Sequence, residues 1–484
     1  MVERAEGHRG IVRGVESPAP GQALPPFDPW RSAMVAADVI QAQHAGPRAL
    51  GERREHRLAA LLRSAATKSP LYRELLRGRD PSCLRLADVP PMRKTDLMAR
   101  FDDWVADPAL HLEALRRFTA DPARIADPFL GRYVVWESSG SSGEPAVFVQ
   151  DAAAMAVYDA LEALRRPLLR PLQRWLDPWQ MGERVAFVGA IGGHFASTVS
   201  IERLRRLNPA LGARLHSVSF LQPVGAMLDE LNAIAPTAIA TYPSAAVLLA
   251  EERLAGRLRV PLREMWTGGE TLTAAMRRHI EQAFDCSVVN SYGASDFLSL
   301  ACACRCGALH LNSDWVVLES VDAAGRPAPL DAPGASTLLT NLANHVQPLI
   351  RYDLEDRVTF RSTACACGSS LPVIEVEGRC DDTLSLAGAG GRRVSVLPLA
   401  LTTVLEDDAG LFDFQLLQQG PASLLLTTPG EGPEGEAALR RGREVLGAFI
   451  TAQGGRGVRI EGRCGQARHP GRSGKVQRVD AQHG

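Results

Sequence analysis

The sequence of 484 residues is poor in lysine, in long apolar runs and in net charge. Only three of its 54 basic residues are lysines, namely Lys68, Lys94 and Lys475. No apolar run approaches the ~18–20 residues that cross a bilayer, so we expect no membrane span. The 54 basic and 55 acidic residues give a net charge of -1, whereas a protein held to nucleic acid by phosphate neutralisation is usually basic. Membrane-spanning and nucleic-acid-binding functions are therefore disfavoured.

The N-terminal segment lacks the features of a targeting signal. Residues 1–30 mix charges and prolines and contain no hydrophobic core region of the kind that a secretory signal requires. The chain as a whole is 45% hydrophobic and 23% charged, which is typical of a globular protein with ample core. We therefore expect a cytoplasmic protein with a flexible segment over residues 1–30, and the length favours two or three domains.

Apolar spacing indicates helices from about residue 31 to 130, and after them strand-like runs alternate with helices. This alternation is typical of an α/β fold with parallel strands. We expect a large N-terminal domain with parallel and mixed sheets over 31–377 and a small mobile α+β domain over 378–484. The strands expected in the alternating region are 185–189, 238–240 and 264–266, and the helices are 151–166, 224–234, 244–254 and 274–284.

A loop of small residues follows the apolar run 133–136, and it reads Ser138-Ser139-Gly140-Ser141-Ser142-Gly143. Such residues let backbone and hydroxyl donors approach a polyphosphate without steric bulk, although a loop of this kind is also typical of a plain turn. It is not a Walker A motif, because the single Gly-Lys pair, Gly474-Lys475, is followed by valine.

Four further motifs follow in order. The second begins with Gly268-Gly269-Glu270 after a strand and continues to Tyr292, Gly293 and Asp296 at the end of a later strand, at the sheet edge where open α/β sheets bind ligands. Each motif alone could be a turn, so their order carries the information. The third motif contains Asp356, the fourth Arg379 and Asp381, and the fifth Lys475.

In order and spacing, the five motifs resemble the adenylate-forming superfamily of acyl-CoA synthetases, adenylation domains and luciferases. Within it the chain is most similar to the phenylacetate–CoA ligase family, and the resemblance extends from residue 69 to Lys475. It implies that the loop 138–143 holds the β- and γ-phosphates of ATP. It also implies that Gly268, Gly269 and Glu270 pack along the adenine and that Tyr292, followed by Gly293, stacks on it.

The resemblance further implies roles for five residues near the phosphates and the hinge. Asp356 would bind the ribose hydroxyls, Arg379 the ribose or phosphate, and Asp381 would be the hinge of the small domain. Asp296 would help to hold Mg²⁺, although the family usually has glutamate there. Lys475 would bridge the substrate carboxylate and the nucleotide. Glu355, before Asp356, replaces a glycine that is usual in the family.

The implied reaction is activation of a carboxylic acid by ATP and Mg²⁺ to an acyl-adenylate and pyrophosphate, followed by thioester formation with coenzyme A. The flexible cation of Lys475 suits this chemistry, because carboxylate attack on a phosphate brings two anions together. By resemblance the acid is aryl or arylacetic, and Tyr242 is a candidate for the lining of its pocket. The enzyme expected is an AMP-forming acid–thiol ligase, for which a homodimer stays open.

Two alternatives remain. In the nearer one, the acyl group passes to a carrier-protein thiol or an amine, and pyrophosphate exchange without CoA-dependent AMP release would favour it. In the more distant one, the chain is a non-catalytic interaction protein stabilised by zinc, whose nucleotide site has decayed. The departures at Asp296 and Glu355 support this second alternative, and the retained Lys475 and Asp356 oppose it.

The cysteines form a separate pattern. Two short clusters of thiols in an apparently cytoplasmic protein indicate a tetrahedral zinc site rather than disulfides. Relatives in the family resembled also carry a Cys/His zinc site at these two places. The expected ligands are Cys304, Cys306, Cys365 and Cys367. His310 is the reserve for Cys306, and Cys302 is spare. Four protein ligands would make the zinc structural.

Overall fold

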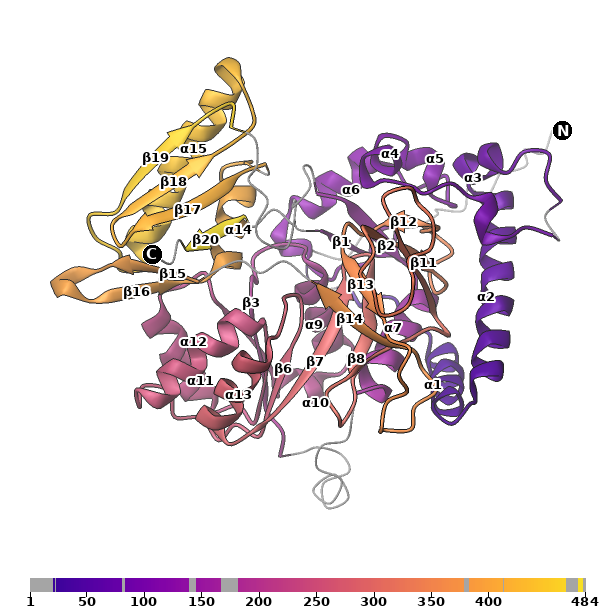
Figure 1. Ribbon diagram of the computed structural model, residues 1–484, viewed down its shortest axis with the longest axis horizontal. Coiled ribbons are helices and arrows are strands. Elements are labelled where there is room, and N and C mark those ends of the chain that lie inside the picture. The colour runs from indigo at the N-terminus through magenta and orange to yellow at the C-terminus, as the bar shows by residue number, and fades with distance from the viewer. Residues whose placement is uncertain are drawn as a thin grey trace, which may run out of the picture.

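The structure is a computed structural model that describes residues 21, 23–80, 83–138, 145–166, 182–377, 383–411, 413–466 and 478–481. Figure 1 shows a large body that contains the described chain up to residue 377 and a smaller C-terminal lobe at its upper left. The α/β fold class expected from the sequence is confirmed.

A nine-stranded sheet forms the centre of the large body, in the order β13-β14-β9-β8-β7-β6-β5-β3-β4. From β4 to β7 neighbouring strands run parallel, and from β7 to β13 they run antiparallel. The sheet is therefore mixed, with β7 at the change of direction. Its strands are β3 (Val185–Gly189), β4 (Leu215–Ser219), β5 (Ala238–Thr241), β6 (Glu264–Thr267), β7 (Ser287–Ala294), β8 (Phe297–Ala303), β9 (Leu309–Leu311), β13 (Arg357–Phe360) and β14 (Val373–Glu377).

Helices connect the parallel strands, as the alternating pattern predicted. The helix that Asp151 was expected to cap begins where its carboxylate accepts a hydrogen bond from the backbone nitrogen of Ala154, at 2.8 Å. The expected helices over 224–234 and 274–284 have the predicted bounds. The helices of this region are α7 (Ala152–Leu164), α9 (Ala196–Leu207), α10 (Pro209–Gly212), α11 (Val224–Ile234), α12 (Pro243–Leu254) and α13 (Ala274–Phe284).

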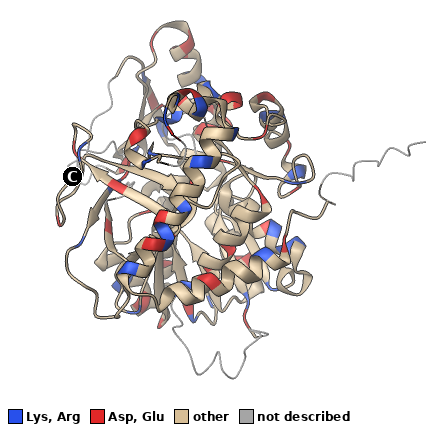
Figure 2. Cartoon of the chain, turned by 90° about the vertical axis from the view of Figure 1, so that its right-hand side faces the viewer, with Lys and Arg blue, Asp and Glu red and all other residues tan. Residues whose placement is uncertain are grey.

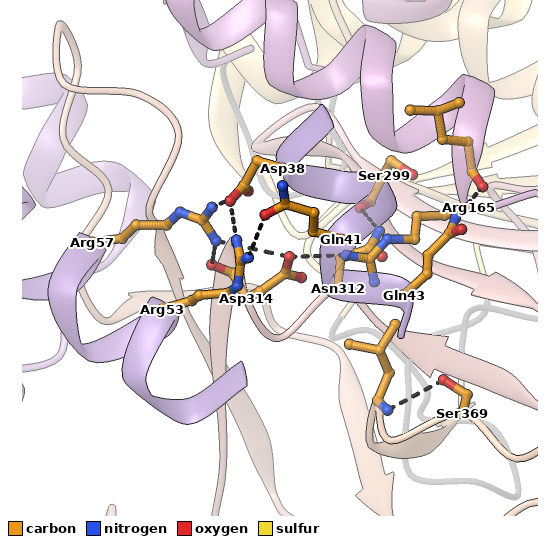
Figure 3. A network of polar contacts seen from close by, with 12 residues as sticks. Asp38, Gln41, Gln43, Arg53, Arg57, Arg165, Ser299, Asn312, Asp314 and Ser369 are labelled. Atoms are coloured by element: carbon orange, nitrogen blue, oxygen red, sulfur yellow. Dashed lines mark hydrogen bonds and ion pairs between the residues drawn. The ribbon is translucent and has the colours of Figure 1, made fainter. Parts of the chain in front are cut away.

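Helices before residue 130 cover one side of the large body (Figure 1). A buried polar network fastens them to the sheet (Figure 3). Asp314, whose side chain is fully buried, accepts from Arg165 at 2.8 Å, and its carbonyl oxygen accepts from Arg57 at 2.6 Å. These helices are α1 (Pro29–Gln43), α2 (Pro47–Lys68), α3 (Pro70–Leu75), α4 (Lys94–Ala99), α5 (Phe101–Trp104) and α6 (Leu112–Thr119), with short 3-10 turns at Leu86–Asp88 and Pro122–Arg124.

Two smaller antiparallel sheets complete the large body. The hairpin of β1 (Val134–Glu137) and β2 (Val147–Gln150) carries the Ser/Gly loop at its turn. The second sheet contains β10 (Val316–Val321), β11 (Ser336–Asn341) and β12 (Tyr352–Asp353). One continuous hydrophobic core contains residues from α1 through β14, and a second packs around the parallel strands.

The C-terminal lobe has a core of its own. It consists of a hairpin and a four-stranded sheet in the order β19-β18-β17-β20, with two helices and a 3-10 turn at Ala389–Gly391. Its elements are β15 (Leu384–Ala387), β16 (Arg393–Val396), α14 (Pro398–Asp407), β17 (Gln415–Gly420), β18 (Ser423–Thr427), α15 (Gly432–Ala452), β19 (Arg459–Arg463) and β20 (Val479–Ala481). Among the described residues, no helix combines the length and apolarity that a membrane crossing needs.

Candidate active site and metal centre

A cavity of about 1460 Å³ opens at the carboxyl ends of β5, β6 and β7 and extends to the C-terminal lobe. This is the edge at which parallel α/β sheets bind ligands. The lobe contributes Leu399, Thr402 and Thr403 of α14 and Arg478 to the cavity wall. Arg478 is itself held by a buried ion pair with Glu406, at 2.6 Å. The cavity therefore has walls from both parts of the chain.

Glycines shape the cavity wall after β6. Gly269 has φ of +79°, and a Cβ there would lie 2.8 Å from a ring carbon of Tyr242. A Cβ on Gly268 would lie 2.9 Å from the hydroxyl oxygen of Ser291. Only glycine fits this close approach of backbone to side chains, and the result is a smooth surface against which a flat ligand can pack.

Glu270 and Tyr242 fix that loop in place. The Glu270 carboxylate accepts two hydrogen bonds from Ser244, from its backbone nitrogen and from its hydroxyl, both at 2.9 Å. Ser244 stands at the N-terminus of α12, where a carboxylate is electrostatically favoured. Burial, together with the nearby Glu270 carboxylate, raises the pKa of Tyr242 to about 12. Glu270 thus holds the loop to α12, and Tyr242 lies under Gly269.

Tyr292 and Asp356 meet at the cavity although 64 residues separate them. The Tyr292 hydroxyl donates to Asp356 Oδ2 at 2.8 Å. Burial, with the Asp356 carboxylate beside it, holds the pKa of Tyr292 well above its usual value, so the hydroxyl stays a donor. Gly293 makes the geometry feasible, because a Cβ there would lie 2.0 Å from the Leu298 carbonyl oxygen.

Asp296 is buried in the same cavity, 9% exposed. Burial raises its pKa to about 6, while a hydrogen bond from Tyr352 and the Lys94 ammonium act in the opposite direction. Its Oδ1 has no hydrogen-bond partner among the described residues. A buried carboxylate oxygen without a partner, at the wall of a cavity, is a feature that a bound cation would satisfy.

Ser138 and Ala146 form a hydrogen-bonded pair at the base of the Ser/Gly loop. The Ser138 backbone nitrogen donates to the Ala146 carbonyl at 2.9 Å, and the Ser138 hydroxyl accepts from the Ala146 nitrogen at 3.0 Å. The rest of the loop and several other predicted residues lie outside the described part of the chain. These are Ser139, Gly140, Ser141, Ser142, Gly143, Arg379, Asp381 and Lys475.

Glu355 adopts a left-handed backbone conformation, with φ of +58°. Glycine reaches this region without the steric cost that a Cβ brings. The structure thus gives a physical reason why a glycine suits this position, and it shows that the glutamate is accommodated. Asp356 still lies within hydrogen-bond distance of Tyr292.

The two cysteine clusters meet where the turn after β8 approaches the turn before β14. The sulfur or Nε2 atoms of four residues lie within 4.8 Å of one another. Cys304 and Cys365 are 3.6 Å apart at their sulfur atoms, and Cys367 Sγ is 3.3 Å from His310 Nε2. The four residues are Cys304, His310, Cys365 and Cys367.

The surroundings of this cluster match those of a metal centre. His310 Nδ1 lies 2.9 Å from the Leu371 carbonyl oxygen, which can only accept, so the proton sits on Nδ1 and the Nε2 lone pair faces the sulfur atoms. Backbone nitrogens donate to two sulfur atoms, from Cys306 to Cys304 at 3.3 Å and from Ser369 to Cys367 at 3.5 Å. Such donors stabilise thiolates.

Cys306, the first choice from the sequence, lies at the solvent edge of the cluster. Its side chain is exposed and within hydrogen-bonding reach of the thiols of Cys304 and Cys365, and local desolvation together with these two thiols raises the Cys306 pKa. The compact set of four contains His310, the sequence's reserve, in its place. Cys302 is buried and its sulfur lies 3.7 Å from the Ser299 hydroxyl, in keeping with its spare role.

Sequence reasoning missed Tyr352 and gave no role to Lys94. Tyr352 sits in β12, and a hydrogen bond to Asp296 joins it to the cavity wall. Lys94 begins α4 and lines the cavity, although it precedes Asp296 and Tyr352 by more than 200 residues. The scarcity of lysine was the signal that could have singled it out.

The comparisons with known proteins agree with the resemblance. A phenylacetate–coenzyme A ligase from Thermus thermophilus is 27% identical over 374 residues, which cover 72% of this chain and 74% of that protein. A solved 2-hydroxyisobutyryl-CoA ligase in complex with 2-HIB-AMP and CoA has a TM-score of 0.56 at 19% identity, with 91% of each chain covered.

An open conformation of the same ligase has a TM-score of 0.51 at 21% identity, covering 88% of this chain and 90% of that one. No protein-family model matches the chain. The likeness in fold and the sequence relative together confirm the resemblance to adenylate-forming CoA ligases that the motifs indicated.

Proposed function

We propose that this chain, related in sequence and fold to adenylate-forming CoA ligases, is an AMP-forming acid–CoA ligase. It activates a carboxylic acid with ATP to an acyl-adenylate and pyrophosphate, and then forms a thioester with coenzyme A and releases AMP. The observation that carries the proposal is the bond between Tyr292 and Asp356 at the cavity wall. It places a flat aromatic ring beside a carboxylate, as recognition of an adenosine requires.

The nucleotide lies against the glycines after β6. Gly268 and Gly269 form the flat surface, and Tyr292 covers the base. Asp356 accepts from the ribose hydroxyls with the carboxylate oxygens that Tyr292 leaves free. The loop that Ser138 closes holds the β- and γ-phosphates, and Arg379 reaches the ribose or the α-phosphate.

Lysine ammonium groups neutralise the charge that develops when the carboxylate attacks the α-phosphate. Lys475 is the principal cation, and Asp381 is the hinge that brings it to the nucleotide and withdraws it for the second step. Lys94 supports it from the large body, since it lines the cavity close enough to lower the Asp296 pKa.

Asp296 fits a magnesium ion. Its unpartnered Oδ1 offers the hard anionic oxygen that Mg²⁺ prefers. Bound Mg²⁺ supplies charge neutralisation for the phosphates. Asp296 would hold Mg²⁺ with a side chain one methylene shorter than that of the glutamate usual in the family.

Zinc fits the Cys/His cluster, with Cys304, Cys365, Cys367 and His310 as ligands. Three thiolates and one imidazole form a closed tetrahedral set, so the ion is structural. It fastens the turn after β8 to the turn before β14. Cys306 is the alternative fourth ligand.

The acid is aryl or arylacetic. Phe195, Tyr242 and Trp266 line the cavity beyond the nucleotide wall, and such aromatic surfaces favour a flat apolar acid. The acceptor is coenzyme A rather than a carrier-protein thiol or an amine, a choice supported by the sequence relative and the solved structure of similar fold, which are both CoA ligases.

The test is ATP-dependent pyrophosphate release against a panel of aromatic and aliphatic acids, with and without CoA. Lys475→Ala is run beside the wild type, and Lys68→Ala serves as the matched control, because Lys68 is an exposed residue in the last turn of α2. We expect release that depends on one class of acid, persists in the control and falls by ~10²-fold or more in Lys475→Ala.

Each other outcome has a distinct meaning. Equal activity of Lys475→Ala and wild type would contradict the assignment of Lys475. Pyrophosphate exchange without CoA-dependent AMP release would favour the carrier-protein or amine acceptor. Absence of ATP binding by calorimetry, in folded and metal-loaded protein, would favour the non-catalytic alternative.

A further inference from the structure

Helix α1 carries an apolar stripe on its outer face. Trp30 is 82% exposed, Met34 72% and Ile40 47%. Ala33 and Ala37 are also exposed and lie between them. At 100° per residue these five side chains, called here the α1 stripe, fall on one side of the helix over three turns.

The opposite face of α1 is apolar as well. Val35, Val39 and Ala42 are buried and contribute to the cores beneath. A surface helix of a single globular chain usually has a polar outer face, whereas a helix that is apolar all round is buried. Helix α1 therefore has two apolar faces, separated by polar residues such as Arg31, Asp38 and Gln43, and one of these faces is exposed in this chain.

The helix is held so that the stripe stays outward. Asp38 forms ion pairs with Arg53 and Arg57 of α2, and these belong to the buried network of Figure 3. The guanidinium of Arg57 also lies 3.5 Å from the centre of the Trp315 ring. Figure 2 views this side of the molecule, with α2 toward the reader. Rolling α1 to bury the stripe would break these contacts.

The stripe is complementary to itself. In an antiparallel pair of α1 helices centred on Ala37, Met34 faces the second copy's residue 40, Ala37 faces its counterpart and Trp30 faces residue 44, a histidine. The small side chains at the centre allow a close approach of the two helices, and the large ones interlock at the ends. Arg31 faces a glutamine, so no like charges meet.

The exposed area is sufficient for such a pair. Leu24 (72% exposed) and Phe27 (51%) extend the stripe before the helix. With aromatic side chains of ~150–250 Å² and aliphatic ones somewhat smaller, the apolar area is about 600 Å² on each chain. Two copies together would bury about 1,200 Å², which reaches the lower end of specific interfaces, and Trp and Met are enriched in their cores.

The chain's own N-terminal residues are a poorer occupant. Residues 1–20 contain seven charged or histidine side chains, three glycines and two prolines, a composition that opposes a continuous apolar helix. We propose that the α1 stripe is the interface of a two-fold symmetric homodimer, in which α1 packs antiparallel against α1 of a second copy. The proposal does not depend on the catalytic activity.

The test is sedimentation velocity of the full chain at ~1 to 50 µM. We expect the wild type to sediment at twice the chain mass of 52.2 kDa. Ala37→Glu places two carboxylates opposite each other at the two-fold axis, and it should raise the dimer dissociation constant by at least ~10²-fold. Ala37→Lys should do the same, and an equimolar mixture of the two variants should restore the dimer.

Leu254→Glu is the matched control, because Leu254 is an isolated leucine at the end of α12 that is 64% exposed. It should leave the dimer intact. If Ala37→Glu proves poorly folded by circular dichroism, Met34→Gln replaces it. A monomeric wild type would overturn the proposal, whatever covers the α1 stripe. The proposal would also fail if Ala37→Glu and Ala37→Lys both remained dimeric.

Discussion

Two clusters join the same two stretches of chain, 292–310 and 352–367, and they do so with different chemistry. At one end Tyr292 meets Asp356, and at the other the sulfur and imidazole ligands meet, across separations of 57 to 64 residues. The Tyr292–Asp356 contact is complete, because a hydroxyl donates to a carboxylate. The Cys/His cluster offers four electron-pair donors, which need a shared cation.

Their backbones differ as well. Gly307 and Gly368 provide the positive φ values in the two cysteine turns, both +83°. At the nucleotide end, Arg351 (φ +51°) and Glu355 (φ +58°) adopt the left-handed conformation without being glycine. The cysteine turns of the metal cluster therefore avoid backbone strain by using glycine. The residues around Asp356 at the cavity retain backbone strain, as functional sites often do. Four variants test this distinction.

Asp356→Ala should have the largest effect. It removes the acceptor of the Tyr292 hydroxyl and the proposed ribose ligand together, and we expect kcat/KM for ATP to fall by ~10²-fold, or about 2.7 kcal/mol. Tyr292→Phe keeps the ring and the carboxylate, so its loss should be nearer ~10-fold. Steady-state kinetics with varied ATP measure both, and an unchanged Asp356→Ala enzyme would contradict the assignment.

His310→Ala should break the metal end and leave the nucleotide end assembled. We expect less than one zinc per chain by elemental analysis and a free energy of unfolding lower by about 2 kcal/mol, because three ligands hold the ion more weakly than four. Cys306→Ser is the matched control and should retain full zinc. The reverse result, with zinc lost from Cys306→Ser alone, would put Cys306 in the fourth position.

Asp296→Asn should change how stability depends on pH. The folded-state pKa of Asp296 is raised to about 6, so ionisation of this carboxyl destabilises the folded chain as pH rises from ~4 through ~6. The variant should therefore gain stability over the wild type up to about 3 kcal/mol at neutral pH and nothing below pH ~4. Denaturant unfolding at both pH values measures the difference.

The Asp296 carboxyl should also determine how activity falls on the acidic side of the pH–activity profile. Magnesium binding needs the ionised form, so wild-type activity should rise with pH through about 6. The stability difference between wild type and Asp296→Asn could instead be the same at neutral pH and below pH ~4. That result would show that the Asp296 carboxyl does not titrate in this range.

Glu355→Gly should have the smallest effect. Glycine relieves the left-handed strain but is more flexible in the unfolded chain, so we expect a net gain of about 0.5 kcal/mol in stability. Thermal unfolding measures it, and Glu375→Gly in β14, where the backbone is extended, should instead destabilise. A loss of stability in Glu355→Gly would mean that the glutamate side chain contributes more than the strain costs.

The sequence predicted the elements whose signal is local. The helices over 224–234 and 274–284 and the strand over 185–189 have the expected bounds, because apolar periodicity and caps such as Asp151 specify them. The roles of Tyr292 and Asp356 followed only from resemblance, and their contact was not predicted, since no local pattern reports a contact across 64 residues.

What the sequence could not supply was three-dimensional context. Burial of Asp296 and its hydrogen bond with Tyr352 depend on how β12 approaches the turn between β7 and β8. The preference for His310 over Cys306 depends on the Leu371 carbonyl, which fixes the imidazole. The α1 stripe was overlooked because apolar residues spaced for a helix indicate a core face, and only exposure distinguishes the two faces.

Because both clusters join the same two stretches of chain, their binding equilibria are expected to affect each other. If metal binding at the cysteine turns favours the spacing at which Tyr292 meets Asp356, the two binding equilibria are linked, and linkage is reciprocal. The factor by which the bound ion increases nucleotide affinity must equal the factor by which the bound nucleotide increases ion affinity. Saturation with ATP would then slow the release of zinc to a chelator, and a chain engaged in turnover would retain its ion longer than a resting one.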